Sequence, residues 1–202
     1  MIVGIYLAAG NSSRMGRSKL SLPLGGQCLG SYGLSAALQS NLDRVIVITR
    51  EHDRLDWIDS NMRKNQQKLI PTVCETANLG QSHSLKTGVK VAQSYNADAT
   101  VVMLADQPFV TKEIVNELIY HFIKKHPNYV AASLGGIKKP PILFNSSLYP
   151  SLLQIKGDQG ARNIVRTASG LTIDYKNHKN FFDIDTPEDY HFVKKYFKKS
   201  LR

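Results

Sequence analysis

Cysteine is scarce in this sequence of 202 residues: Cys28 and Cys74 are the two present, and they lie far apart. This count excludes a disulfide-dense scaffold and a zinc site made of CxxC pairs. We therefore expect a reduced, cytoplasmic protein, with a single Cys28–Cys74 disulfide as the alternative. The apolar stretch at residues 2–8 is short and has no basic region before it, and no run reaches the length of a membrane span. We expect neither a secretory signal nor a membrane partner.

Acidic residues are also few: 16 Asp and Glu stand against 26 Lys and Arg, for a formal net charge of +10. Such an excess favours a polyanionic partner, which can be nucleic acid, an acidic membrane or a small phosphorylated substrate. The lysines gather in runs typical of solvated faces, as in 191–202, and aromatic residues do not alternate with Arg as in stacking platforms. No zinc-finger or RNP pattern occurs. We expect a small polyanionic substrate and no nucleic acid partner.

Three common ligand-binding motifs are missing. A Walker A loop needs G-x-x-x-x-G-K-[ST], but five residues separate Gly10 from Gly16 and Arg17 stands where Lys is required. The G-x-G-x-x-G pattern of dinucleotide sites is missing from the same loop. The six His residues form no H-E-x-x-H or other metal-binding spacing. The loop after the first apolar run therefore belongs to another class.

Apolar, β-branched segments alternate with segments of helical periodicity. Continuous apolar runs are typical of strands buried on both faces, and the alternation predicts right-handed crossovers. We expect an α/β fold of three layers, in which helices cover both faces of a mainly parallel sheet. The expected strands are 2–8, 44–49, 69–73, 100–105 and 129–134, and the expected helices are 30–40, 52–64, 82–95, 113–125 and a last one from 187.

The pattern changes after residue 134. Residues 135–180 are rich in Gly and Pro and break into short pieces, which predicts a small C-terminal lobe packed beside the sheet. Residues 181–202 predict a closing strand and a helix, with Thr186 as N-cap. We expect one domain, 1–202, in which 1–134 carries most of the sheet.

The loop LAAGNSSRMGRSK, residues 7–19, has the chemistry of a phosphate site. Ligands bind beyond the carboxyl ends of parallel strands, which is where this loop begins. The small residues at 8–10 let backbone N–H groups approach a ligand, and Arg14 and Lys19 add two cations. These features match a triphosphate, while a plain strand-to-helix turn with two surface charges is the alternative.

Three aspartates are candidate site residues, and two of them form a pair that could bind a metal ion. Asp106 follows the apolar run 100–105 directly, at the edge where ligands bind. Asp183 and Asp185 are two apart, so in an extended segment both point to one side, and such a pair repels unless a cation lies between them. Mg²⁺ prefers oxygen ligands of this kind. Helix capping is the alternative role, and we favour Asp185 over Asp183 as the ligand.

Five segments together resemble one known family. LAAGNSSRMGRSKLSLPLGG resembles the signature L-[AG]-[AG]-G-x-S-x-R-[MF]-G-x-x-K of the MobA-like nucleotidyltransferases. GQSHSLKTGV, MLADQPFVT, GDQGAR and DIDTPEDY resemble its later motifs, in the family's order and across nearly the whole chain. Within the family they are most similar to the molybdenum cofactor cytidylyltransferase branch, which includes accessory proteins of purine catabolism. The resemblance implies a Rossmann-like nucleotidyltransferase fold.

The resemblance also implies roles for individual residues. Residues 1–134 would form the nucleotide-binding part, and 135–180 would lie on the acceptor side. The implied catalytic residues are Arg14, Lys19 and Asp106, and the implied Mg²⁺ ligands are Asp106, Asp185 and Asp183. The implied nucleotide contacts are Leu7, Ala8, Ala9, Gly10, Arg14, Lys19, Asn78, Gly80, Ser82 and Ser84. The implied acceptor contacts are Asp158, Gln159, Gly160 and Arg162. Cys74 and Lys139 depart from the branch, which has Asn and His at these positions.

The activity implied is Mg²⁺-dependent transfer of CMP from CTP to molybdenum-molybdopterin, with release of pyrophosphate. CTP is preferred because guanylyl members carry Gly at the position of Ala9, whose methyl group leaves less room for a purine. Transient contact with a molybdenum hydroxylase, such as a xanthine dehydrogenase, is implied for delivery of the product. Two alternatives stay open: the same chemistry on a sugar phosphate or methylerythritol phosphate, and a non-catalytic nucleotide-binding protein or cofactor chaperone.

Overall fold

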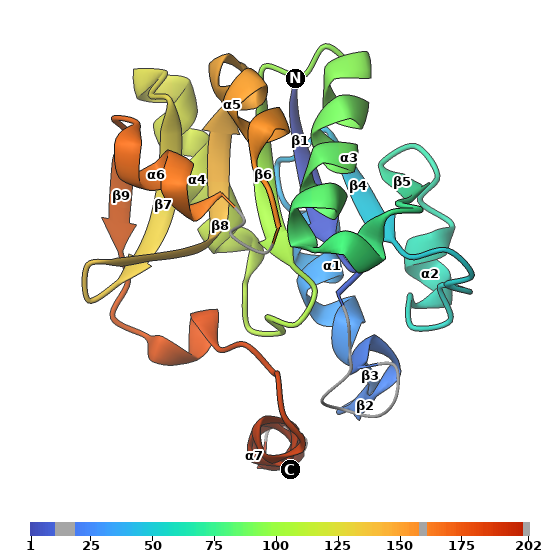
Figure 1. Ribbon diagram of the computed structural model, residues 1–202. Coiled ribbons are helices and arrows are strands. Elements are labelled where there is room, and N and C mark those ends of the chain that lie inside the picture. The colour runs from blue at the N-terminus through green and yellow to red at the C-terminus, as the bar shows by residue number, and fades with distance from the viewer. Residues whose placement is uncertain (11–18, 158–160, 200–202) are drawn as a thin grey trace.

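Seven strands form one sheet in the order β5-β4-β1-β6-β8-β7-β9 (Figure 1). The computed structural model describes residues 1–10, 19–157 and 161–199, with side chains to Phe197. Neighbouring strands are parallel except for β8, which is antiparallel to β6 and to β7. The expected α/β fold with a mainly parallel sheet is confirmed. The strands are β1 Ile2–Leu7, β4 Arg44–Thr49, β5 Leu69–Val73, β6 Ala99–Leu104, β7 Tyr129–Leu134, β8 Ile137–Asn145 and β9 Leu171–Asp174.

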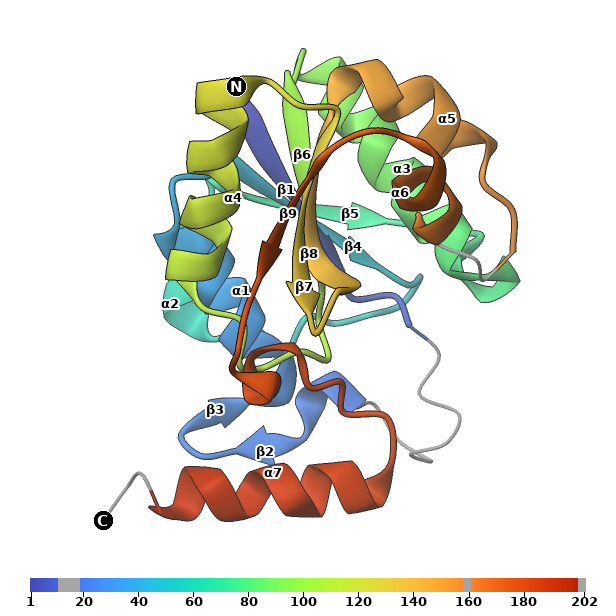
Figure 2. The ribbon, with the colours of Figure 1, turned by 90° about the vertical axis from the view of Figure 1, so that its left-hand side faces the viewer.

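Helices cover both faces of the sheet (Figure 2). Helices α1 and α4 lie on one face, and α3, α5 and α6 lie on the other, so the interior strand β1 is buried along its whole length. The helices are α1 Leu29–Gln39, α2 Ser60–Arg63, α3 Gln81–Ser94, α4 Lys112–Lys125, α5 Tyr149–Gln154, α6 Arg162–Thr167 and α7 Pro187–Lys199, with 3-10 turns at Lys19–Ser21, Ala77–Leu79, Ser146–Leu148 and His178–Phe181. No helix in these described ranges has the length and apolar character of a membrane span.

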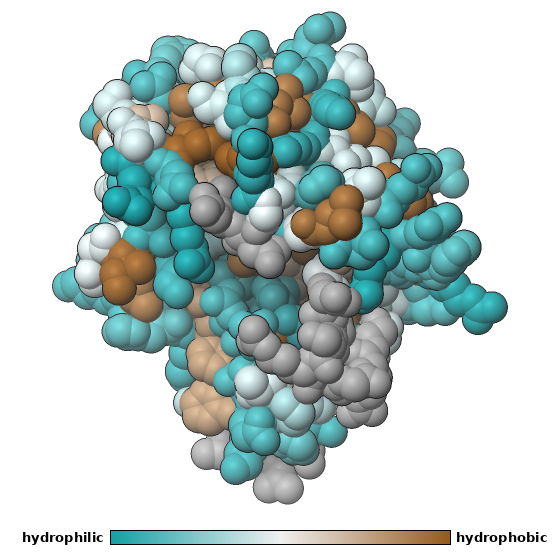
Figure 3. All heavy atoms as spheres, in the orientation of Figure 1, coloured by the Kyte–Doolittle hydropathy of each residue, from teal (hydrophilic) through white to brown (hydrophobic). Residues whose placement is uncertain are grey.

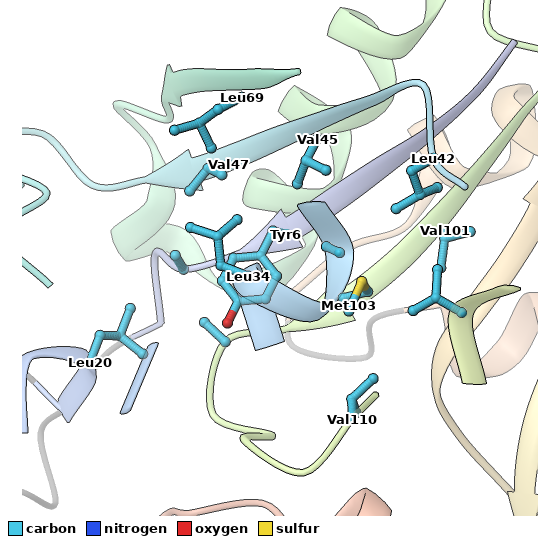
Figure 4. Close-up of a cluster of buried hydrophobic side chains, with 14 of the residues drawn as sticks. Tyr6, Leu20, Leu34, Leu42, Val45, Val47, Leu69, Val101, Met103 and Val110 are labelled. Atoms are coloured by element: carbon cyan, nitrogen blue, oxygen red, sulfur yellow. The ribbon is translucent and has the colours of Figure 1, made fainter. Parts of the chain in front are cut away.

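The core on the α1 side is built around Tyr6. Figure 4 shows Tyr6 of β1 among Leu34 of α1 and Met103 of β6, all on the same side of the sheet. The Tyr6 hydroxyl donates a hydrogen bond to the Gly30 carbonyl at 2.7 Å, so its polar end is satisfied inside the core. Burial of each large side chain contributes about 1.5–3 kcal/mol, which holds the carboxyl ends of β1 and β6 in place.

The segment expected as a lobe beside the sheet lies partly within it. Strand β8 sits between β6 and β7, and β9 forms an edge, so residue 134 is not a division of the fold. The prolines of β8 obscured this strand in the sequence. The β7–β8 register passes from Ala131 opposite Ile142 to Ala132 opposite Lys139, so the intervening Pro140 and Pro141 lie in a bulge where no ladder donor is required.

A small layer outside the sheet comes from elsewhere in the chain. Strands β2 Pro23–Leu24 and β3 Gln27–Cys28 form a hairpin, and α7 packs against it (Figure 2). The Tyr190 hydroxyl of α7 donates to the Pro23 carbonyl, and the ring of Phe197 stacks on Phe109. The last helix is therefore confirmed, but the closing strand expected at 181–185 is not present. Cys28 and Cys74 are both free thiols.

The helix expected at 52–64 shrinks to the single turn of α2. Leu55 has a positive φ of 59°, which ends helical geometry there. The Asp53 carboxylate accepts from the Leu55 backbone N–H at 2.8 Å and from the indole N–H of Trp57 at 3.3 Å. This local turn competes with the helix, as side-chain-to-backbone bonds of Asp commonly do.

Candidate active site

A cavity of about 580 Å³ opens at the carboxyl ends of β1 and β6. Figure 3 shows the molecule hollowed there, between the body of the sheet and the layer that contains α7. One wall is the end of β1, and the opposite wall is the turn before α3. The lining residues are Leu7, Ala8, Ala9, Gly10, Lys19, Leu20, Ala77, Asn78, Leu79, Gly80, Gln81, Ser84, Leu104, Ala105, Asp106 and Asp185.

The β1 wall has the small residues expected of a close approach to a ligand. The backbone N–H of Ala8 still bonds the Ile48 carbonyl at 2.9 Å, so the strand geometry continues past Leu7. Ala8 and Ala9 pack into the cores on opposite faces of the sheet, and Gly10 is exposed at the rim. Ala9 is 3% exposed, so its methyl group fills the core side of the wall.

The turn before α3 forms the facing wall. Asn78 and Gly80 lie on it with Ser84 of the first helical turn. Gly80 has φ 119°, a conformation that L side chains rarely adopt, so glycine is needed here. A hydrogen bond of 3.1 Å between Thr76 Oγ1 and His83 Nδ1 joins the two ends of the turn. The sequence predicted that this turn lies at the site, but not that Thr76 and His83 are bonded to each other.

Ser82 does not line the cavity, in contrast to its expected place among the nucleotide contacts. Its side chain is fully buried, and its backbone N–H donates to the Gly157 carbonyl at 3.2 Å. Gly157 directly precedes the expected acceptor segment. The backbone N–H of Ser82 therefore joins the start of α3 to that segment, while the Ser82 side chain is buried in the protein.

Lys19, Asp106 and Asp185 meet in the cavity. Lys19 Nζ lies 2.9 Å from Asp106 Oδ2 and 3.1 Å from Asp185 Oδ1, and the lysine side chain is 13% exposed. Burial lowers the pKa of the Lys19 ammonium group, but the two carboxylates raise it more, so the net pKa is above its ordinary value. One cation is thus shared by two carboxylates at the expected phosphate site.

A backbone hydrogen bond brings the third segment to this cluster. The Ile184 N–H donates to the Asp106 carbonyl at 3.1 Å, and the fully buried Ile184 side chain anchors the segment in the core. Asp183 and Asp185 then lie on either side of Ile184. The segment crosses the ends of the strands instead of extending the sheet.

Asp183 is separated from the cavity. Its Oδ1 accepts from the Gln107 side-chain amide at 2.8 Å, and it is not part of the cavity wall. Burial raises the pKa of Asp183, and the Asp106 charge raises it further. Gln107 was not identified from the sequence, since a buried amide beside a carboxylate has no spacing signature.

The donor set fits a divalent cation. Asp106 Oδ1 is buried and has no hydrogen-bond partner within the described part of the chain, while its Oδ2 and Asp185 Oδ1 already contact one ammonium group. Carboxylate oxygens are the ligands that hard cations prefer. Within residues 1–10, 19–157 and 161–199, however, no three His, Cys, Asp or Glu side chains gather as a ready-made metal site. Two carboxylates and substrate phosphates would have to share such an ion.

Several expected site residues lie outside the described residues. These are Arg14, Asp158, Gln159 and Gly160. Arg162, the last of the expected acceptor contacts, begins α6 with an exposed side chain and does not line the cavity.

The two departures from the family pattern occupy different surroundings. Cys74 is buried, and its sulfur accepts from Thr87 Oγ1 at 3.3 Å, away from the cavity wall. Lys139 is half-buried on β8, and its charge partly offsets the raised pKa of Asp183. Cys74 therefore packs as a core residue, whereas Lys139 adds a cation near the aspartate cluster.

Residues 4–173 match the MobA-like NTP transferase domain. The chain is 38% identical over 200 residues to the purine catabolism protein PucB of Bacillus subtilis, with 96% of each chain covered. It is 20% identical over 210 residues to a probable molybdenum cofactor guanylyltransferase of Natranaerobius thermophilus, with 98% of each chain covered.

Solved structures share the fold. A nucleotidyl transferase from Methanothermobacter thermautotrophicus has a TM-score of 0.78 at 20% identity, with 99% of both chains covered. The Rv0371c protein of Mycobacterium tuberculosis, solved in complex with manganese, has a TM-score of 0.73 at 20% identity, with 96% of this chain and 98% of that chain covered. At these identities the similarity establishes the architecture.

Proposed function

The chain belongs to the MobA-like NTP transferase family, and from that premise we propose that it transfers CMP from CTP to molybdenum-molybdopterin. It is a nucleotidyltransferase linked to PucB and to molybdenum cofactor biosynthesis. The observation that carries the proposal is the Lys19 ammonium group shared by Asp106 and Asp185 in the cavity beyond β1 and β6.

The reaction needs no covalent enzyme intermediate. A terminal phosphate oxygen of the acceptor attacks the α-phosphorus of CTP, the bond from that phosphorus to the bridging oxygen breaks, and pyrophosphate leaves. Positioning and charge neutralisation carry most of such a phosphoryl transfer. Lys19 stabilises the charge that develops on the leaving pyrophosphate, in a site where the ammonium group is already oriented. Arg14 is proposed as a second cation for the triphosphate.

Asp106 and Asp185 would hold a Mg²⁺ ion, which neutralises triphosphate charge and orients the phosphates when bound. The buried Oδ1 of Asp106, which has no hydrogen-bond partner among the residues that the structure describes, supports this assignment. Asp183, hydrogen-bonded to Gln107, is proposed to support the cluster from behind.

The β1 wall and the turn before α3 are proposed to bind the nucleotide. Leu7, Ala8, Ala9 and Gly10 would line the nucleotide. Ala9 and Gly10 would offer it their backbone groups, since the Ala8 N–H already bonds the Ile48 carbonyl. The methyl group of Ala9, packed on the core side of this wall, is proposed to leave less room for a purine and so to favour the smaller cytosine. The 38% identity to PucB supports the same branch.

The acceptor is proposed to enter beside residues 158–162, next to the Gly157 carbonyl that Ser82 holds. Its phosphate meets the basic residues of this side, among them Lys139 and Arg162. The product would pass to a molybdenum hydroxylase of the xanthine dehydrogenase type in the cytoplasm, in keeping with two free cysteines and a relative that acts in purine catabolism.

The test is a substrate panel. The purified protein is mixed with Mg²⁺, molybdenum-molybdopterin and each NTP in turn, and dinucleotide and pyrophosphate are measured. We expect CTP to be used at least about tenfold faster than GTP, a difference of about 1.4 kcal/mol. Faster use of GTP overturns the choice of base, and turnover only with a sugar phosphate or methylerythritol phosphate overturns the acceptor. CTP binding without turnover on any acceptor indicates a chaperone. Ala9→Gly probes the β1 wall directly, and it is expected to lower the ratio of the turnover rate with CTP to the turnover rate with GTP.

A further inference from the structure

The carboxylate of Asp189, in the first turn of α7, is bonded to Thr186, the residue that follows Asp185. Asp189 Oδ2 accepts from the Thr186 backbone N–H at 2.9 Å and from the Thr186 hydroxyl at 2.9 Å, and the Asp189 N–H donates to Thr186 Oγ1 at 3.2 Å. These bonds between positions 186 and 189 form a capping box, which serves the helix alone. The same Oδ2 also accepts from the Asp185 backbone N–H at 3.1 Å. A capping box does not require this last bond.

Asp185 needs such an anchor. Its side chain is 50% exposed, so packing does not hold the carboxylate in place. Its backbone is fixed on the N-terminal side: the Ile184 N–H bonds the Asp106 carbonyl at 3.1 Å, and the Asp185 N–H bonds Asp189 Oδ2 at 3.1 Å. Asp106 and Asp189 thus clamp the two consecutive peptide groups that precede the Asp185 side chain.

We propose that Asp189 is a positioning residue for Asp185, which it holds at the cation position opposite Asp106. The inference rests on the proposed function, in which Asp106 and Asp185 share a divalent ion. Asp189 touches neither the ion nor the substrate; it sets the backbone from which the Asp185 carboxylate projects. Partners of this kind that orient a metal-binding side chain typically change metal affinity by 10–100-fold when they are removed.

The test separates positioning from capping with four variants. Asp189→Ala removes the cap and the bond to Asp185. Asp189→Glu keeps the usual capping-box residue but moves the carboxylate one methylene further along, so the helix start survives and the bond to Asp185 is displaced. Thr186→Ala weakens the cap but leaves the backbone bonds to Asp189. Glu188→Ala removes a neighbouring exposed charge that makes none of these bonds.

The readouts are Mn²⁺ affinity, measured by electron paramagnetic resonance with a non-hydrolysable CTP analogue present, and the melting temperature. We expect Asp189→Ala and Asp189→Glu to weaken Mn²⁺ binding by about tenfold or more. We expect Thr186→Ala to lower the melting temperature while Mn²⁺ affinity stays within about twofold, and Glu188→Ala to change neither. Because Asp189→Glu is expected to melt as the natural protein does, the result does not depend on whether the Ala variant folds.

The proposal is overturned if both Asp189 variants bind Mn²⁺ as the natural protein does, or if Thr186→Ala weakens Mn²⁺ binding equally. Absence of Mn²⁺ binding by the natural protein overturns it too, since no ligand is then being positioned. Failure of the proposed function has a different signature: Mn²⁺ and the CTP analogue bind, and Asp189 variants weaken the metal, yet no acceptor is converted.

Discussion

Lys19 Nζ lies 2.9 Å from Asp106 Oδ2, although 87 positions separate the two residues along the chain. The same nitrogen is 3.1 Å from Asp185 Oδ1. The ammonium group therefore stands where the two carboxylates would otherwise repel each other. It links the turn after the first strand, the end of β6 and the segment before the last helix in one ionic cluster.

Replacing Lys19 by Met tests both roles of this ammonium group. The variant keeps the length of the side chain and removes its charge, so turnover should fall by roughly 100-fold or more through the loss of preorganised stabilisation. Mn²⁺ binding without nucleotide should become tighter, because the ammonium group no longer competes for Asp106 and Asp185. Steady-state kinetics and a Mn²⁺ titration measure the two effects. Lys90→Met, at an exposed position of α3, is the matched control and should change neither. Weaker Mn²⁺ binding by the Lys19 variant would contradict the competition.

Replacing Asp106 by Asn should separate catalysis from binding. The amide keeps the shape but loses the charge that a divalent ion needs, so Mg²⁺-dependent turnover should drop by roughly 100-fold or more. Binding of CTP in the absence of metal should persist, because a negative charge near the triphosphate is gone. Isothermal titration and product analysis check the two halves. Full turnover in this variant would remove Asp106 from the catalytic set.

Asp183→Asn should stabilise the protein at neutral pH. The pKa of Asp183 is raised by burial and by Asp106, so the folded state binds its proton more tightly than the unfolded chain. Stability is therefore lost as the pH rises from the ordinary value of 3.8 through the raised value. At about pH 7.5 the variant should melt roughly 2 °C higher, and near pH 3.5 the gain should vanish.

The same variant assigns the second metal ligand. The new amide oxygen of Asp183→Asn can still accept from Gln107, so this variant should need the same Mg²⁺ concentration for turnover as the natural protein. Asp185→Asn should lose Mg²⁺-supported turnover. Mg²⁺ titrations of turnover for both variants decide the matter. Equal losses would place Asp183 at the metal as well.

Gly157→Ala should weaken binding of the acceptor but not binding of CTP. Gly157 has φ 59°, and an L side chain there costs about 1–2 kcal/mol, which shifts the segment that Ser82 holds. The KM for the acceptor should rise several-fold while the KM for CTP stays the same. Gly135→Ala is the matched control, since φ is 56° there, in the turn between β7 and β8. It should lower the melting temperature equally and leave both KM values unchanged.

The nucleotide side of the site was predictable because it depends on local rules. An apolar strand followed by small residues places Ala8, Ala9 and Gly10 at the carboxyl edge of the sheet, and a second such strand brings Asp106 to the same edge. Parallel neighbouring strands end at the same edge of a sheet, so the small residues after β1 and Asp106 after β6 could be placed together without knowing how the core packs. Lys19 was expected there as one of the two cations of the same loop.

The rest depends on contacts that no local pattern carries. Prolines 140 and 141 argued against a strand, but the bulge gives them positions without a ladder bond. The 183–185 alternation looked like a strand, yet a single bond from Ile184 to Asp106 lays it across the strand ends. In that placement Asp183 accepts from Gln107 and Asp185 contacts Lys19. The spacing of the two aspartates in the sequence could not show these different partners.

The bond between Ile184 and Asp106 also makes the candidate site depend on the last helix. Residues before Asp183 form all seven strands of the sheet and both facing walls of the cavity. Asp185 follows them in the sequence, and its backbone is fixed by bonds that involve Asp106 and the first turn of α7. Loosening of α7 is therefore expected to withdraw the second carboxylate from the cavity while the sheet and both walls stay in place.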